Sequence, residues 1–152
     1  MGRKWIAWLC CVLAVLMVVP ALVGCGSKEE TEVKTIVIGD LTDLTGPAQN
    51  AMTPISWSLV DYCNYINTEG LLPGVNLVVV QYDTKYDTSR FGLGYDSVKA
   101  QGADVIWTGF PGVAESLNTR AGIDGIPIIC ASSTVALVDN PGAVFCLAAL
   151  MR

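Results

Sequence analysis

Short runs of β-branched and other apolar residues alternate along this chain with longer stretches of helical periodicity. The runs are TIVIG at residues 35–39, NLVVVQY at 76–82, DVIWTG at 104–109 and IPIIC at 126–130. Each is apolar at consecutive positions, as in parallel strands that are buried on both faces. The element order is therefore βαβαβαβ. With right-handed crossovers, this order predicts an α/β fold, a doubly wound three-layer α/β/α parallel sheet.

The first stretch between these runs has the features of a helix that begins at Pro54 and ends at Gly70. Proline favours the first position of a helix, and glycine favours the position just after its end. Apolar side chains recur between them with helical spacing. This spacing predicts one buried face, made of Ile55, Leu59, Tyr62 and Ile66.

Two further helices are expected. Asp87 can cap a helix that carries apolar residues on one face, namely Phe91, Tyr95 and Val98. Gly92 and Gly94 lie in the same stretch and lower its intrinsic helix propensity. A third, shorter helix fits residues 113–121.

The expected strand order is 2-1-3-4 or an extension of it. In that order the chain leaves strand one in one direction and strand three in the other, which opens a crevice at the carboxyl edge of the sheet. The loops at this edge would be residues 40–50, 109–115 and 131–142. The apolar segment FCLAALMR at 145–152 is expected to form a further strand.

Residues 1–24 have the layout of a secretory signal. Arg3 and Lys4 give a positive start, and residues 5–24 carry no charge. About twenty apolar residues could also cross a bilayer, so an uncleaved anchor is the alternative, with a soluble secreted product as a third. Pro20 and the small residues after it favour cleavage.

The order LVGC at residues 22–25 resembles the bacterial lipobox. This resemblance implies that Cys25 receives lipid and becomes the new N-terminus, which anchors the protein to the membrane. The polar residues 25–34 would then be a tether. Residues 35–152 would form the folded domain.

Six cysteines suggest a disulfide framework, but their positions do not support one. Cys10 and Cys11 lie in the signal segment, and Cys25 is assigned to lipid. The remaining three are an odd number, lie far apart and form no CxxC motif, so they predict neither a metal site nor a stapled fold. We expect small buried side chains, with one disulfide still open, among Cys63, Cys130 and Cys146.

Composition excludes several functional classes. The formal net charge is −5, and it becomes more negative when Arg3 and Lys4 leave with the signal, so nucleic acid is not an expected partner. The absence of histidine removes the common catalytic triads and zinc sites. A single DLTG at residues 43–46 lacks the second loop of an aspartic protease, and GLG at 92–94 does not directly follow a strand. We predict no enzyme, no catalytic residues and no cofactor.

Several segments in register resemble one family. They are the lipobox, TIVIGDLTDLTGPAQ, INTEGLLPGVNLVVVQYDTKYDTSR, GADVIWTG and GIPIICASST. Together they are similar to the extracellular substrate-binding lipoproteins of branched-chain amino-acid type ABC importers, the type I periplasmic binding proteins that include leucine-binding proteins. The resemblance implies two lobes that close on a small ligand, of which residues 35–152 would be an incomplete N-terminal lobe. It also implies an ABC permease as partner, a location outside the cytoplasm and no enzymatic activity.

The resemblance also implies site residues. Ser132, Ser133 and Thr134 match the segment that contacts the head group of the ligand, although capping of the next helix is the alternative. The family has two serines after the third strand, where this chain has Phe110, Pro111 and Gly112 instead. These three residues are expected to line the site and to favour a ligand other than a plain amino acid.

The first loop supplies Asp43 and Thr45 as pocket edges, with a turn role as the alternative. The predicted function is therefore capture of a small polar molecule, such as an amino acid or an amide, for import. Two alternatives remain open. They are a receptor sensor domain, and a structural lipoprotein that binds nothing if the chain truly ends at Arg152.

Overall fold

The structure is a computed structural model that describes residues 32–148, and the element bounds follow the chain order. The predicted signal segment, Cys25 and most of the predicted tether lie outside the described residues. The strands are β1 (Lys34–Thr42), β2 (Val75–Asp83), β3 (Val105–Thr108), β4 (Ile128–Cys130) and β5 (Val144–Cys146). The helices are α2 (Gln49–Glu69), α3 (Thr88–Ala100), α4 (Pro111–Asp124) and α5 (Val135–Asp139).

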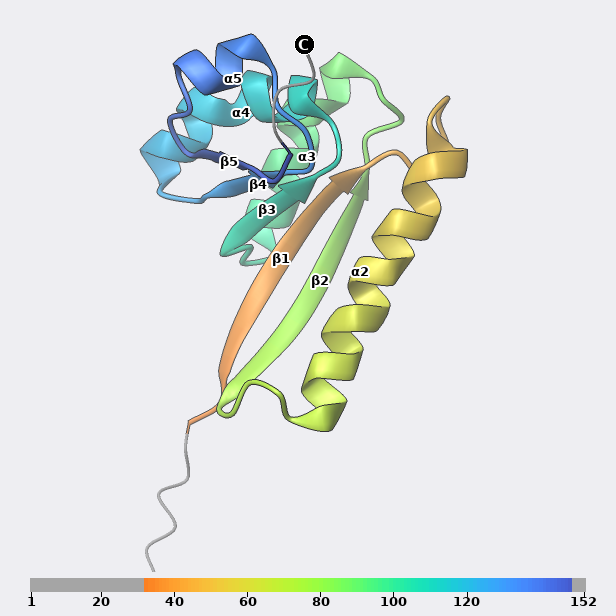
Figure 1. The fold of residues 1–152 in the computed structure, drawn as a ribbon, viewed down its shortest axis with the longest axis vertical. Helices are drawn as coiled ribbons and strands as arrows, with labels where there is room; N and C mark the ends of the chain where they lie inside the picture. Colours follow the sequence, from red (N-terminus) through yellow and green to blue (C-terminus); the bar gives the residue numbers. More distant parts are fainter. Residues whose placement is uncertain (1–31, 149–152) are drawn as a thin grey trace, which may run out of the picture. The chain divides into compact units, whose positions relative to one another are not determined.

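Within residues 32–148 the strands form one parallel sheet in the order β2-β1-β3-β4-β5 (Figure 1). The predicted α/β class and strand order are confirmed, and β5 extends the order at the β4 edge. Lys34, the last residue of the predicted tether, is instead the first residue of β1. Strand β1 is also longer than predicted, since it continues through Asp40 to Thr42.

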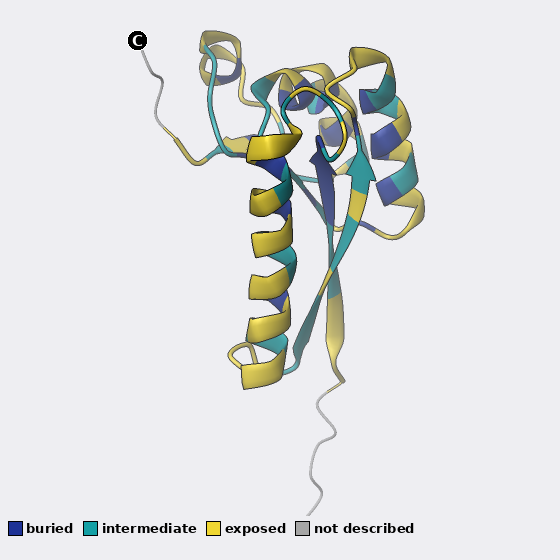
Figure 2. Cartoon of the chain, turned by 90° about the vertical axis from the view of Figure 1, so that its right-hand side faces the viewer, coloured by how far each residue is buried: buried dark blue, intermediate teal, exposed yellow. Residues whose placement is uncertain are grey.

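The helices lie on both faces of the sheet. Successive residues of a strand point to opposite faces. Gly39 faces Val98 of α3, whereas Asp40 bonds to Ser56 of α2. Helices α2 and α3 therefore cover opposite faces of β1 and β2 (Figure 2). The main core lies on the α3 and α4 side, where Tyr95, Ile106 and other side chains are fully buried.

The prediction of a helix capped by Asp87 is confirmed by α3. Asp87 is its N-cap and accepts a hydrogen bond from the backbone N–H of Ser89 at 2.9 Å. The predicted apolar residues are buried together, and they are Phe91, Tyr95 and Val98. Helix α4 also contains its predicted range and extends beyond it at both ends.

Helix α2 differs from its prediction at its start and in its buried face. It begins at Gln49, so Pro54 lies inside the helix, while Gly70 ends it in a left-handed conformation as predicted. The predicted face is wrong in part, because Ile55 and Tyr62 are 45% and 61% exposed, whereas Leu59 and Ile66 are half-buried. The buried residues are Met52, Ser56 and Cys63.

Contacts with the sheet determine how α2 is rotated about its axis, and hence which of its residues are buried. Ser56 bonds to the buried carboxylate of Asp40 in β1 and accepts a hydrogen bond from Gln81 of β2 at 2.5 Å. Near the other end, the Asn67 side chain bonds to both backbone groups of Leu77 in β2. Two polar anchors thus decide which side of the helix faces the sheet, whereas apolar spacing alone points to a neighbouring side.

An apolar row crosses the α2 side of the sheet beyond β1. Trp107, Ile129 and Phe145 are register partners on β3, β4 and β5. Their strand neighbours Ile106, Ile128 and Val144 belong to the core on the other side, so this row faces the side that carries α2. Helix α2 packs mainly against β1 and β2, and Phe145 is 62% exposed.

Candidate functional site

The predicted site residues all follow strands β1, β3 or β4 at the carboxyl edge of the sheet. The reversal of strand order lies between β1 and β3, where the loops after these two strands lead to opposite faces. The Ser132 hydroxyl in the loop after β4 donates to the carbonyl of Gly109 after β3 at 3.4 Å. The structure therefore brings the predicted loops after β3 and β4 into direct contact.

The loop after β1 is held by a buried carboxylate. Asp43 is fully buried and accepts hydrogen bonds from the backbone N–H groups of Gly46 and of Ala48, the latter at 2.7 Å. Its side chain therefore forms the turn and is not a pocket edge. The turn alternative for Asp43 is the one that the structure supports.

Thr45 extends this loop toward β2. Its hydroxyl donates to a carboxylate oxygen of Asp83 at 2.5 Å, and the Leu44 N–H donates to the other oxygen at 2.9 Å. Burial opposes ionisation of Asp83, but these bonds and one from the Lys85 N–H hold its pKa below the ordinary value. Thr45 is exposed at the edge with its proton already donated, so it can offer a ligand only its lone pairs.

An aromatic pair, formed by Phe110 after β3 and Tyr86 after β2, lies where the resembled family has two serines. The rings of Phe110 and Tyr86 lie 4.6 Å apart between centroids, tilted by 58°. Phe110 is also the N-cap of α4, and no side chain caps the first turn of this helix. Pro111 is half-buried and Gly112 is exposed, so the start of α4 is open toward solvent.

The three hydroxyls after β4 already have protein partners. Ser133 donates to the carbonyl of Ala148 at 3.0 Å, in addition to the bond from Ser132 to Gly109. Thr134 bonds to Glu115 and accepts the Leu137 N–H at 3.4 Å as the N-cap of α5. The capping alternative thus applies to Thr134. A ligand carboxylate would require the serine hydroxyls to rotate away from their carbonyl acceptors.

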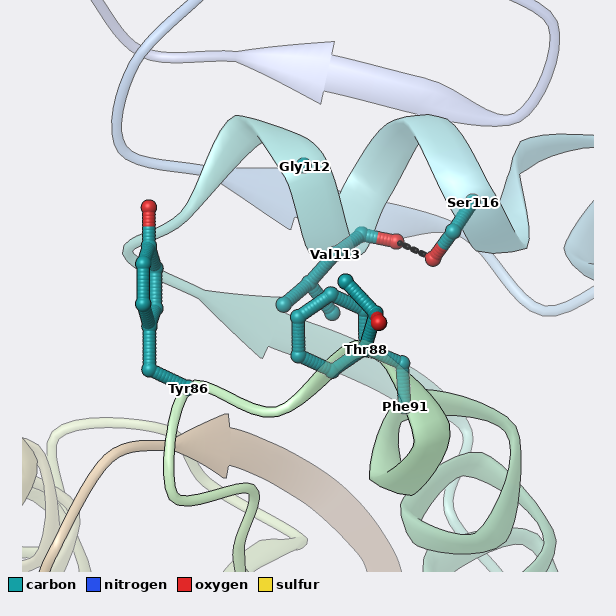
Figure 3. Close-up of a pocket in the computed structure, with 6 residues that line it drawn as sticks. All are labelled: Tyr86, Thr88, Phe91, Gly112, Val113 and Ser116. Carbon is teal, nitrogen blue, oxygen red and sulfur yellow. Dashed lines mark hydrogen bonds between the residues drawn. The ribbon is translucent and has the colours of Figure 1, made fainter. Parts of the chain in front are cut away.

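A pocket of about 220 Å³ lies beside this edge, between the N-termini of α3 and α4 (Figure 3). It is largely apolar and lined by Tyr86, Thr88, Phe91, Gly112, Val113 and Ser116. Gly112 is one of the predicted site residues, whereas Tyr86 is a lining residue that the sequence does not indicate. Tyr86 and Lys85 both have a φ of 53°, a left-handed conformation that nothing in their residue types indicates.

Two other features bear on the kind of site. Among residues 32–148, no group of three or more histidine, cysteine, aspartate or glutamate side chains could hold a metal ion. In the same part of the chain, no helix combines the length and apolarity that a membrane crossing requires.

Comparison with known proteins identifies similar sequences and folds. Residues 35–150 match the family described as "Periplasmic binding protein". No curated protein matched the chain. A branched-chain amino acid ABC transporter protein from Thermus thermophilus, solved with bound valine, has a TM-score of 0.66 and 25% identity. The match covers 74% of this chain and 30% of that one.

Two other solved structures share the fold but differ in ligand. A fatty acid ABC transporter substrate-binding protein from Thermomonospora curvata has a TM-score of 0.61 and 24% identity, over 66% of this chain and 26% of that one. A solute-binding protein from Rhodopseudomonas palustris BisB5, in complex with 3,4-dihydroxybenzoic acid, has a TM-score of 0.56 and 17% identity. That match covers 74% of this chain and 31% of the other. The chain thus spans about 30% of the length of these proteins.

Proposed function

The chain belongs to the periplasmic binding protein family, and on that premise we propose that it is part of the lipid-anchored solute-binding component of an ABC importer. Members of this family work in the periplasm or outside the cytoplasm. The matched family and the similar structures are transporter binding proteins, in agreement with the prediction that the chain is not an enzyme. The ligand, the permease and the lipid anchor are the proposed parts of this function.

The observation that carries the proposal is the meeting of three loops at the carboxyl edge. The loops after β1, β3 and β4 lie at one edge with an uncapped helix start, and Ser132 joins two of these loops. The serine hydroxyls after β4 could meet a ligand by rotating away from their present acceptors. Backbone N–H groups and hydroxyls of this kind can replace the water that a ligand carboxylate loses on binding. The edge therefore suits a small molecule with a carboxylate or another polar head group.

The aromatic pair narrows the ligand class. Phe110 and Tyr86 place apolar area next to the open start of α4. A ligand with an apolar or aromatic body would bury this area, whereas a small and fully polar ligand would leave it exposed to solvent. We therefore favour a small carboxylate with an apolar body. Valine in the similar Thermus thermophilus structure has this character.

The proposal is tested by ligand binding to the product of the complete reading frame. A panel of branched-chain amino acids, aromatic carboxylates, fatty acids and amides would be screened by thermal shift, and positive compounds measured by calorimetry. We expect one class to raise the melting temperature, and Ser132→Ala to weaken its binding by about five- to tenfold, as for loss of one hydrogen bond of about 1 kcal/mol. Ser58→Ala is the matched control, because that exposed hydroxyl bonds only within α2.

A panel with no stabilising compound would contradict solute binding. Equal losses in the Ser132 and Ser58 variants would contradict the proposed site while leaving binding intact. Genes for a permease and an ATPase beside this gene would support import, and a gene continuing into a signalling domain would favour a sensor instead.

Lipid anchoring is tested separately. We expect metabolic labelling with a radioactive fatty acid to label the protein, and Cys25→Ala to abolish both the label and membrane association. Unlabelled wild-type protein in the soluble fraction would contradict the anchor without affecting solute binding.

A further inference from the structure

Two of the cysteines are neighbours in the sheet. Cys130 and Cys146 are the last residues of β4 and β5, and they are direct register partners in this parallel pair. Both side chains contact the same hydrophobic core, so they project from the same face of the sheet. The third described cysteine, Cys63, lies in α2.

The register places this pair within reach of a disulfide. Adjacent strands lie about 4.8 Å apart, and bridged cysteines have Cα atoms roughly 4.4–6.8 Å apart. The Cβ atoms of a bridged pair are closer, at about 3.8 Å, so bond formation requires a small shift of one strand. Strand β5 has three residues and pairs with β4 at the end of the strand order, so it can make this shift.

We propose that Cys130 and Cys146 form a disulfide that joins β4 to β5 in the exported protein. Such bonds persist outside the cytoplasm, where members of this family work. The bond encloses residues 131–145, which include Ser132, Ser133 and Thr134. It therefore fixes the loop of the candidate site to the sheet. That consequence rests on the proposed function, whereas the disulfide does not.

The two thiols differ in access, and this sets the order of the reaction. Cys146 is half-buried and Cys130 is fully buried. Burial raises the pKa of the Cys130 thiol, and the nearby Cys146 and Glu115 add to this effect. Cys146 is therefore the thiol that meets an external oxidant first.

The oxidant is a disulfide, either of an exported thiol oxidoreductase or of oxidised glutathione. The Cys146 thiolate attacks one sulfur of this disulfide, and the first thiol leaves. Cys130, as its thiolate, then attacks the Cys146 sulfur of the mixed disulfide, and the second thiol leaves. The two cysteines lose two electrons and two protons, and the oxidant becomes two thiols.

The first test maps the bond in protein exported by a bacterial host. Free thiols are alkylated during denaturation, and the protein is digested without reduction and measured by mass spectrometry. We expect a linked pair of peptides that contain Cys130 and Cys146, with alkylated Cys63. In Cys63→Ser, the matched control, we expect the same linked pair. Alkylation of both Cys130 and Cys146 in the exported wild type would overturn the proposal.

The second test follows the reaction on reduced, folded protein treated with oxidised glutathione. The wild type is expected to lose two hydrogens in mass and to retain no glutathione. Cys130→Ser is expected to hold a glutathione on Cys146, and Cys146→Ser is expected to stay unmodified at Cys130. A stable glutathione adduct on Cys130 or Cys146 of the wild type, or unchanged thiols at both, would overturn the proposal without any variant having to fold.

Discussion

Helix α3 contains two glycines, and their replacement by alanine should affect stability differently. An alanine Cβ at Gly94 would lie 2.6 Å from a ring carbon of Tyr82 and 3.1 Å from a methyl carbon of Leu41. At Gly92 the nearest atom to such a Cβ is a guanidinium nitrogen of Arg120 at 4.0 Å. The space beside Gly94 is thus filled by side chains of β1 and β2, whereas the space beside Gly92 is open.

The size of each effect follows from two opposing contributions. Alanine in a helix interior is more favourable than glycine by about 1 kcal/mol. Gly92→Ala should therefore raise the free energy of unfolding by about 1 kcal/mol. At Gly94 the same gain is opposed by overpacking against Tyr82, which costs about 1–3 kcal/mol. Gly94→Ala should leave stability unchanged or lower it by up to about 2 kcal/mol.

Urea denaturation followed by circular dichroism measures both variants in one background. The expected difference between them is about 1–3 kcal/mol, with equal slopes. Tyr82→Leu in a double-mutant cycle should reduce the penalty at Gly94 and leave Gly92→Ala unaffected. If Gly94→Ala stabilises the protein as much as Gly92→Ala does, the close packing of α3 on β2 is refuted.

Other groups give independent predictions. Burial raises the pKa of Asp40 above its ordinary value, despite bonds that favour its ionised form, so its contribution to stability is present at acidic pH and is lost as the pH rises through the folded-state pKa. Asp40→Asn should therefore make the free energy of unfolding less dependent on pH. Urea midpoints of the wild type and the variant, measured at pH 4 and pH 7, check this prediction. Parallel pH profiles of the two proteins would contradict the role of Asp40. Burial, with the bond to Asp124, raises the pKa of Tyr95 to about 12. Absorbance titration should show one tyrosine ionising near that pH, absent in Tyr95→Phe, and the stability this pair contributes should be lost as the pH rises from about 10 toward 12. Phe145→Ser should reduce binding of a hydrophobic dye with little loss of stability, because the ring is 62% exposed. Unchanged dye binding would show that the apolar row of Trp107, Ile129 and Phe145 is covered.

The sequence predicts most of the fold because consecutive apolar residues report burial on both faces of a strand. The positions of β1 to β4, the cap at Asp87 and the stop at Gly70 all follow from local chemistry. The rotation of α2 does not follow from it. That rotation depends on Ser56 and on a carboxylate in β1 that sequence analysis assigns to a loop. A single polar contact between a helix and a strand leaves no periodic signal in the sequence.

The candidate site is predicted in position but not in chemistry. Topology alone places the loops after β1, β3 and β4 at one edge, and all three are predicted from the order of strands. The partners of Thr45 and Ser133 lie in distant segments, at Asp83 and Ala148, so their hydrogen bonds cannot be seen in local motifs. The contact between Phe110 and Tyr86 likewise depends on a left-handed conformation that the residue types do not indicate.

Buried polar groups hold the carboxyl edge in place where the strands end. The Thr84 hydroxyl donates to the carbonyl of Thr42 at 2.8 Å, and the Thr108 hydroxyl donates to the carbonyl of Leu41 at 2.9 Å. Both threonines are fully buried, and Asp43 holds the next turn by two backbone N–H groups. These bonds join the ends of β1, β2 and β3 to one another and close the turn after β1, so the backbone of this part of the edge is fixed without a ligand. A ligand at this edge therefore gains affinity from side-chain contacts without the entropic cost of ordering the loops. Ligand selectivity should then follow the side chains on these loops more than their backbone course.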